Sequence, residues 1–320
     1  MQHTVSPLIT YCGGNQMFVE AIKRVSSFTR PIRFISRRYS DSVVVPGTAT
    51  LFFVNENGYA LTCRHVAREI VHAETVNRNY SEFKKELSGI KKDGKFSAEK
   101  KHAEKRHELG PDRLAQLRVS FAGVSGLKCF HIVMSEKYDL ALIRFDCDPA
   151  IRTEHAVFLN DSSRIQPGKM LCRLGYPFPE FTDFTYDSRN DDIVWTQEGH
   201  QSTPQFPIEG MVTRHIGDGS GHIVGIEMST PGLRGQSGGP LFAENGIVYG
   251  MQSLTYHLHL GFDMKKEKRM INGREEIINN QPFMHVGRCI HVDIIREFLD
   301  QQKVKYYIGE SCEKAEAVNG

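Results

Sequence analysis

Gly235-Gln236-Ser237-Gly238-Gly239-Pro240 is the stretch of this chain that decides its fold and chemistry. Glycines surround a single serine, and a backbone without side chains turns tightly and brings its N–H groups close to a ligand. A serine hydroxyl beside free N–H donors suits attack on a carbonyl carbon and binding of the resulting oxyanion. Because a glycine-rich turn has the same composition, the rest of the chain must supply a base and a group that orients it.

Two upstream stretches supply these groups. Residues 58–67 (GYALTCRHVA) predict a buried strand that runs into a short helical turn, with His65 at the junction. Residues 138–145 (YDLALIRF) place Asp139 directly before an apolar strand. Each residue alone fits a structural role, as a core histidine or a turn aspartate. The chain order His65, Asp139, Ser237, together with the glycine turn, instead predicts a catalytic triad.

These motifs resemble those of the chymotrypsin-fold, trypsin-like serine peptidases, and most closely the bacterial HtrA (Deg) branch. The resemblance extends over roughly residues 43 to 300, through the scaffold segments at residues 47–59, 119–123, 168–179, 210–213 and 287–299. It implies an all-β fold of two six-stranded antiparallel barrels, with an N-terminal helix, a helical insertion and a C-terminal helix. The short stretch after the closing helix predicts that the PDZ domain typical of HtrA enzymes is absent.

The resemblance also implies a role for each site residue. Ser237 is the nucleophile, His65 is the general base, and Asp139 orients the imidazole. The N–H groups of Gly235 and Ser237 form the oxyanion hole. The expected reaction is hydrolysis of peptide bonds in protein substrates through an acyl-enzyme. The alternative is a protease-fold binding or scaffold subunit of a larger complex, with weak or no turnover.

Two groups of residues are expected to bind the substrate. In trypsin-like enzymes an aspartate six residues before the serine receives a basic side chain; here that position is Pro231, followed by Gly232. A pocket without a buried carboxylate cannot offset the desolvation of Lys or Arg, which predicts an uncharged, small or medium-sized P1 residue. The resemblance places the edge that pairs with the substrate backbone at Ser253, Leu254 and Thr255.

Gln236 occupies the position at which secreted relatives use an aspartate to capture a newly cut N-terminal amine. Neutral glutamine cannot form that ion pair, so we expect activation without N-terminal cleavage. Loops around the oxyanion hole are then ordered by a partner, by oligomerisation or by substrate.

The composition favours a protein of the cytoplasm, and we expect no cofactor. The chain has 320 residues, 40% hydrophobic and 24% charged, with a net charge of +2. No apolar run reaches the ~18 residues that span a bilayer, and the N-terminus lacks the apolar centre of a secretory signal. Seven cysteines are scattered singly without metal-ligand spacing, which predicts free thiols in a reducing compartment. We expect neither nucleic-acid nor membrane binding, and the oligomeric state is left open.

The expected domains follow from these segments. Residues 1–42 form an extension with a short helix, in which residues 23–42 are interpreted as a basic surface segment. Residues 43–150 form the first barrel, with His65 and Asp139. Residues 151–303 form the second barrel, with Ser237 and the closing helix. Residues 304–320 form a tail that is expected to be disordered beyond Ile308.

Two insertions depart from the family pattern. Residues 71–115 carry interleaved charges of both signs, and Phe83, Leu87 and Ile90 have helical spacing. Two interpretations stay open, a solvated excursion and an element that binds a regulatory protein; the alternating charges disfavour nucleic acid. Residues 262–280 contain an Asn-Gly turn signal. They predict a hairpin that either shapes or covers the cleft or is simply exposed.

Residues 256–260 place His257 and His259 on one face of a strand. No third ligand is evident in the sequence, so we predict no metal site.

Overall fold

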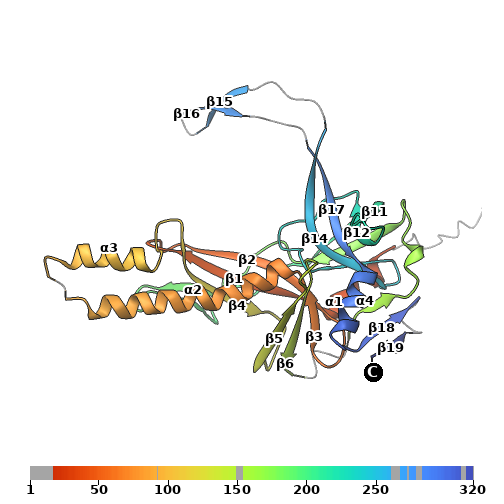
Figure 1. Ribbon diagram of the computed structural model, residues 1–320, viewed down its shortest axis with the longest axis horizontal. Coiled ribbons are helices and arrows are strands. Elements are labelled where there is room, and N and C mark those ends of the chain that lie inside the picture. Colours follow the sequence, from red (N-terminus) through yellow and green to blue (C-terminus); the bar gives the residue numbers. More distant parts are fainter. Residues whose placement is uncertain are drawn as a thin grey trace, which may run out of the picture.

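The computed structural model describes residues 17–91, 93–148, 154–260, 267–271, 274–278, 283–310 and 315–319. Two β-sheets, in which most neighbouring strands are antiparallel, make up most of this structure (Figure 1), which confirms the mostly β fold of the chymotrypsin type. The first sheet is a half-barrel with the strand order β4-β1-β2-β3-β6-β5. Its strands are β1 (Thr29–Arg38), β2 (Val44–Phe53), β3 (Tyr59–Thr62), β4 (Leu114–Phe121), β5 (Cys129–Met134) and β6 (Ala141–Asp146).

The second sheet closes into a six-stranded barrel. Its order is β13-β8-β11-β12-β17-β14, and β13 also pairs with β14, which completes the ring. The strands are β8 (Met170–Gly175), β11 (Phe206–Gly217), β12 (Ile223–Met228), β13 (Pro240–Phe242), β14 (Val248–His259) and β17 (Phe283–His291). Alternating burial in the two sheets gives one continuous apolar core between the barrels, including Phe52, Phe158 and Phe242.

The described residues form four α-helices: α1 (Val19–Phe28), α2 (Arg64–Gly89), α3 (Phe96–Arg106) and α4 (Val292–Gln301). α2 is far longer than the short turn expected after β3, because apolar residues recur along one face and Ala73 and Val76 pack against Leu117 of β4. α2 and α3 extend away from the barrels as an arm (Figure 1). None of the helices in the described part of the chain is long and apolar enough to cross a membrane.

The sheet begins at β1, earlier than the expected boundary at residue 43. β1 lies between β4 and β2, so the interpretation of residues 29–38 as a basic surface segment was wrong. Arg33 and Arg37 are only 7% and 3% exposed. Arg33 pairs with Asp183, and Arg37 pairs with Asp191. These acids lie about 150 residues further on, so nothing near the arginines in the sequence marked them as buried.

A short hairpin supplies those acids. β9 (Phe184–Asp187) pairs with β10 (Asp192–Trp195), and Asp191 lies in the turn between them. Tyr80 of α2 and Tyr186 of β9 donate hydrogen bonds to the Asp191 carboxylate, as does Arg37. The root of the helical arm is therefore fixed to a hairpin that leads directly into β11 of the second barrel.

The C-terminal residues also fold, contrary to the expected disorder. β18 (Tyr306–Gly309) pairs in parallel with β7 (Val157–Leu159) and antiparallel with β19 (Glu316–Val318), and β7 pairs with β14. The expected linker thus contains a strand of the second sheet; residues 149–153, 311–314 and 320 lie outside the described residues.

The second insertion forms the expected hairpin, β15 (Glu267–Ile271) with β16 (Arg274–Ile278), whose turn at residues 272–273 lies outside the described residues. It stands clear of both barrels at the end of the long pair β14–β17 (Figure 1). It is an exposed hairpin in this structure and covers no part of the barrels.

We predict that Asp183→Asn costs about 3–5 kcal/mol of folding free energy, because it leaves the Arg33 guanidinium buried without its counter-charge. Urea denaturation at pH 7 measures this loss. Asp112→Asn is the matched control, since Asp112 pairs with Arg38 at the surface, and it should cost less than about 1 kcal/mol. Equal losses in the two variants would contradict a special role for the buried pair.

Candidate active site

His65 and Asp139 come from neighbouring strands of the first sheet. Thr62, the last residue of β3, pairs with Ala141, the first residue of β6. His65 follows β3 in the first turn of α2, and Asp139 precedes β6. His65 Nδ1 lies 2.8 Å from Asp139 Oδ2, and the His65 backbone N–H donates to Oδ1 at 2.9 Å. Both oxygens of one carboxylate therefore hold the position and the orientation of the imidazole.

The Ser237 loop is wedged between the two barrels. The Ser237 carbonyl accepts a hydrogen bond from the Thr50 N–H of β2, and the Gly238 N–H donates to the Gln252 carbonyl of β14. A Cβ on Gly238 would lie 2.1 Å from the Thr50 carbonyl oxygen, and one on Gly239 would lie 2.1 Å from that of Leu174. The glycines are thus required by close backbone contact, which gives the sequence motif a physical cause.

Gln236 holds the turn before the serine. Its side chain is fully buried; Oε1 accepts from the Leu233 N–H, and Nε2 donates to the Phe206 carbonyl, both at 2.9 Å. Gly235 takes a positive φ of 97° in this turn. Among the described residues, neither the Gly235 N–H nor the Ser237 N–H donates a hydrogen bond. Two backbone donors are therefore available on the same short turn.

Asp139 also receives a hydrogen bond from the second barrel. Ser253 Oγ donates to Asp139 Oδ2 at 2.6 Å, and the Ser253 carbonyl accepts from Ser237 Oγ at 3.3 Å. Within the described residues, Ser237 makes no hydrogen bond to His65. The structure thus brings the three predicted residues to one junction, with the serine hydroxyl turned toward Ser253. A rotation about χ1 is the motion available for bringing Oγ toward His65.

The charge state of Asp139 follows from these contacts. Burial by itself would raise the pKa of its carboxyl, but the hydrogen bonds from the His65 ring and the Ser253 hydroxyl outweigh burial and hold the pKa at about 2. Asp139 is therefore ionised at neutral pH. An ionised acceptor at Nδ1 places the ring proton of a neutral His65 on Nδ1 and leaves Nε2 as the basic nitrogen.

Cys63 is buried next to His65 and Asp139. The atoms of these three residues that could bind a metal ion all lie within 4.8 Å of one another. Burial, and after it the charge of Asp139, raises the pKa of the Cys63 thiol well above its usual range. Because a metal binds the thiolate, a thiol that stays protonated suits this group poorly to a metal ion. The described cysteines (Cys63, Cys129, Cys147, Cys172 and Cys289) form no disulfide with one another.

The predicted substrate residues lie beside the serine loop. Thr255 Oγ1 donates to the Gly232 carbonyl at 2.6 Å and so links the two segments that the sequence assigned to the pocket. The Gln252 side chain fills the space behind Gly232, since a Cβ there would lie 2.3 Å from Gln252 Nε2. Leu254 is 45% exposed on the same strand and is accessible to a partner.

The sequence did not single out Arg173, which contacts the residues next to Gly232 from the interior of the barrel. Arg173 is fully buried in β8 and donates to Gln252 Oε1 and to the Thr230 and Pro231 carbonyls. Burial lowers its pKa, and no carboxylate pairs with it in the described structure. The available signal was an arginine inside the otherwise apolar stretch at residues 170–175.

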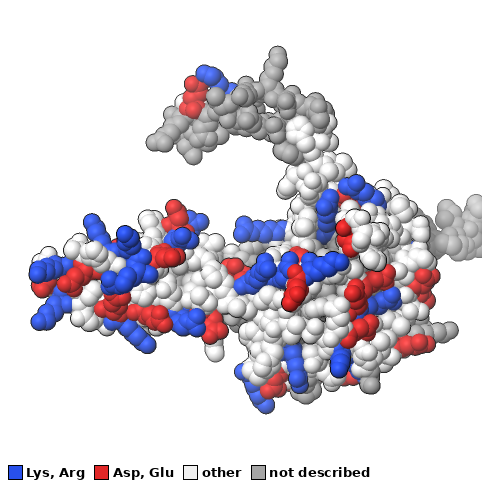
Figure 2. Space-filling model, viewed as in Figure 1, with Lys and Arg blue, Asp and Glu red and all other residues white. Residues whose placement is uncertain are grey.

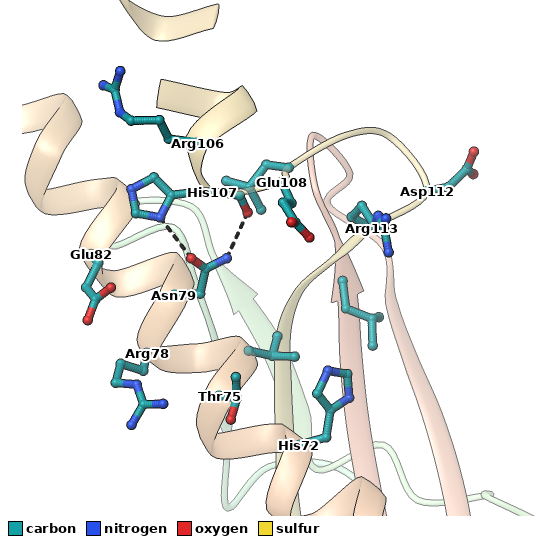
Figure 3. A pocket seen from close by; sticks show the side chains of 13 residues that line it. His72, Thr75, Arg78, Asn79, Glu82, Arg106, His107, Glu108, Asp112 and Arg113 are labelled. Atoms are coloured by element: carbon teal, nitrogen blue, oxygen red, sulfur yellow. Dashed lines mark hydrogen bonds between the residues drawn. The ribbon is translucent and has the colours of Figure 1, made fainter. Parts of the chain in front are cut away.

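A hollow of about 670 Å³ lies elsewhere, between α2 and the segment that follows α3 (Figure 3). His107 and Asn79 hydrogen-bond to each other on its wall, and charges of both signs surround it. None of the predicted site residues lines it, so the hollow belongs to the helical arm.

The family description "Trypsin-like peptidase domain" matches residues 47–251. Among curated proteins, none matches the sequence. The structure is similar to that of an "HtrA-type protease AlgW with decapeptide", with a TM-score of 0.42 and 11% sequence identity; the match covers 88% of this chain and 66% of that one.

We predict that Ser253→Ala destabilises the chain by about 1.5–3 kcal/mol at pH 7, because it removes a hydrogen bond to an ionised group. The depressed pKa of Asp139 gives stability that is present above its unfolded value of about 3.9 and is lost as the pH falls toward 2. Ser253→Ala lacks one of the hydrogen bonds that depress this pKa, so the variant loses less stability as the pH falls through that range. Its free energy of unfolding, measured by urea denaturation, should change less than that of the wild type between about pH 4 and pH 2; an unchanged slope would contradict this account.

Proposed function

The chain belongs to the trypsin-like peptidase family, and from this premise we propose that it is a serine peptidase that cleaves internal peptide bonds of protein substrates with Ser237 as nucleophile. The observation that carries the proposal is the Asp139 carboxylate, which contacts His65 on one side and Ser253, beside Ser237, on the other. Such an arrangement places a base, an orienting acid and a hydroxyl at one junction.

The proposed reaction proceeds in two steps, acylation of Ser237 and hydrolysis of the acyl-enzyme. Ser237 Oγ bonds to the scissile carbonyl carbon while its proton moves to His65 Nε2. The C–N bond then breaks, and His65 returns that proton to the leaving amine. Water repeats the sequence on the acyl-enzyme, and Asp139 stabilises the imidazolium in both steps.

The two unpaired N–H groups of Gly235 and Ser237 support an oxyanion hole. They lie on one turn that the Gln236 side chain holds, so the donors need little reorganisation when charge develops. Each such donor contributes about 3 kcal/mol to transition-state stabilisation in enzymes of this chemistry.

An uncharged, small P1 side chain fits the residues around the predicted pocket. The Arg173 cation lies beneath Pro231 and Gln252 without an acidic partner among the described residues, which disfavours a basic P1 side chain. The hydrogen bond from Thr255 to Gly232 limits the space between the two pocket segments, which favours a short side chain.

Regulation through the helical arm is part of the proposal. α2 begins at Arg64 and includes His65, so a protein bound along α2 contacts the same helix that carries the base. Figure 2 shows acidic and basic side chains interleaved over α2 and α3, which suits a protein partner with both charges. The described cysteines, which form no disulfide with one another, suit a reducing compartment, and we propose the cytoplasm.

An activity probe tests the nucleophile. We predict that a fluorophosphonate labels the wild-type chain and does not label Ser237→Ala, since the phosphorus bonds to Ser237 Oγ. Asp139→Asn should reduce the labelling rate by about 10⁴-fold, because the imidazole loses the acceptor that fixes its tautomer. Gel fluorescence after timed labelling measures both effects.

The alternative, a scaffold subunit with weak or no turnover, predicts the opposite result. Absence of labelling in the purified chain and in its mixture with cell extract would contradict the peptidase proposal and favour the scaffold. Labelling that appears only with cell extract would support control by a partner.

Substitutions at Thr255 test the predicted pocket for the P1 side chain. We predict that Thr255→Gly raises kcat/KM for peptides with Leu or Phe at P1 relative to Ala by about 10-fold or more, because the contact with Gly232 is removed. Thr255→Ser keeps the hydroxyl and should keep the wild-type preference. An unchanged preference in Thr255→Gly would contradict the assignment of this pocket.

A further inference from the structure

The paired strands β14 and β17 extend beyond the second barrel (Figure 1). Three histidines lie on one face of this extension. His257 lies directly opposite His285 in the register of the two strands. His259 follows His257 by two positions, which places both on the same face of β14. All three side chains are exposed. The sequence showed only the pair on β14, because the third member lies 28 residues from His257.

His257 and His285 face each other through their ring nitrogens. The two Nδ1 atoms lie 2.5 Å apart, with the ring planes at 88°. Two strands thus direct nitrogen ligands to the same point. Ligand nitrogens at 2.0–2.1 Å from a tetrahedral ion lie about 3.3 Å from each other, so exposed side chains need to separate by only about 0.8 Å to admit one.

We propose that His257, His259 and His285 bind a divalent transition-metal ion, for which Zn²⁺ is the best match. Three neutral imidazoles are ligands that Zn²⁺ prefers, whereas Mg²⁺ and Ca²⁺ prefer oxygen. His257 and His285 supply two converging ring nitrogens, and His259, on the same face of β14, has to turn its ring toward them to become the third ligand. Water completes the four-coordinate shell.

The bound ion joins β14 to β17 at the root of the exposed hairpin. Thr255, at the predicted substrate edge, lies two residues before His257 on the same strand. Metal binding therefore fixes the direction in which the hairpin extends and stiffens the strand that the substrate is proposed to contact. The ligand site itself does not depend on the proposed peptidase activity.

Zn²⁺ binding by the full-length chain tests the site. The chain is first treated with a chelator, and the chelator is removed before Zn²⁺ is added. Isothermal titration calorimetry should show that His257→Ala and His285→Ala each lose one equivalent of bound Zn²⁺ and that His259→Ala loses or weakens the same equivalent. His131→Ala is the matched control, because His131 is an exposed strand histidine of the first sheet, and it should bind as the wild type does.

Amide hydrogen exchange shows which residues Zn²⁺ binding protects. Zn²⁺ should slow amide exchange at residues 256–259 and 284–286 in the wild type and in His131→Ala, but not in His257→Ala or His285→Ala. Wild-type stoichiometry and affinity in any one of the three ligand variants would overturn the three-histidine site. No Zn²⁺ binding by the wild type would leave a hydrogen-bonded imidazole pair and would also overturn it.

Discussion

The position of the whole site depends on one carboxylate at the junction of the barrels. Asp139 accepts hydrogen bonds from the ring and the backbone of His65 in the first barrel and from Ser253 in the second. Its depressed pKa keeps it ionised at neutral pH, so these contacts are charge-assisted and stronger than neutral hydrogen bonds. The carboxylate therefore fixes the imidazole and at the same time holds the strand that borders Ser237.

A second set of contacts, around the buried Arg37, lies away from this junction. Arg37 joins β1 to Asp191 in the hairpin β9–β10, and the same carboxylate accepts a hydrogen bond from Tyr80 of α2. The chain continues from that hairpin to Phe206, whose carbonyl accepts a hydrogen bond from Gln236. Hydrogen bonds at Asp191 and at Phe206, joined by the intervening chain, thus connect the root of the helical arm to the turn before Ser237. This connection is the physical basis for proposing control through that arm.

The sequence predicted what local pattern determines. The glycines around Ser237, the strand before His65 and the helical spacing in the arm reflect short-range constraints, and the structure has the corresponding elements. β1 was missed because Arg33 looked like a surface residue, and the groups that account for its burial, Asp183 and the rings of Phe181 and Trp195, lie about 150 residues further along the chain. Arg173 was missed for the same reason, because its acceptors come from residues 230–231 and from Gln252. The catalytic roles themselves stay a prediction.

A crystal structure of the chain after reaction with a peptidyl phosphonate tests the central claim most directly, because the phosphonate imitates the tetrahedral intermediate. The account predicts continuous density from Ser237 Oγ to phosphorus, with the phosphoryl oxygen within hydrogen-bonding distance of the Gly235 and Ser237 N–H groups. Unmodified Ser237 after exposure to the reagent, or a phosphoryl oxygen directed away from that turn, would contradict it.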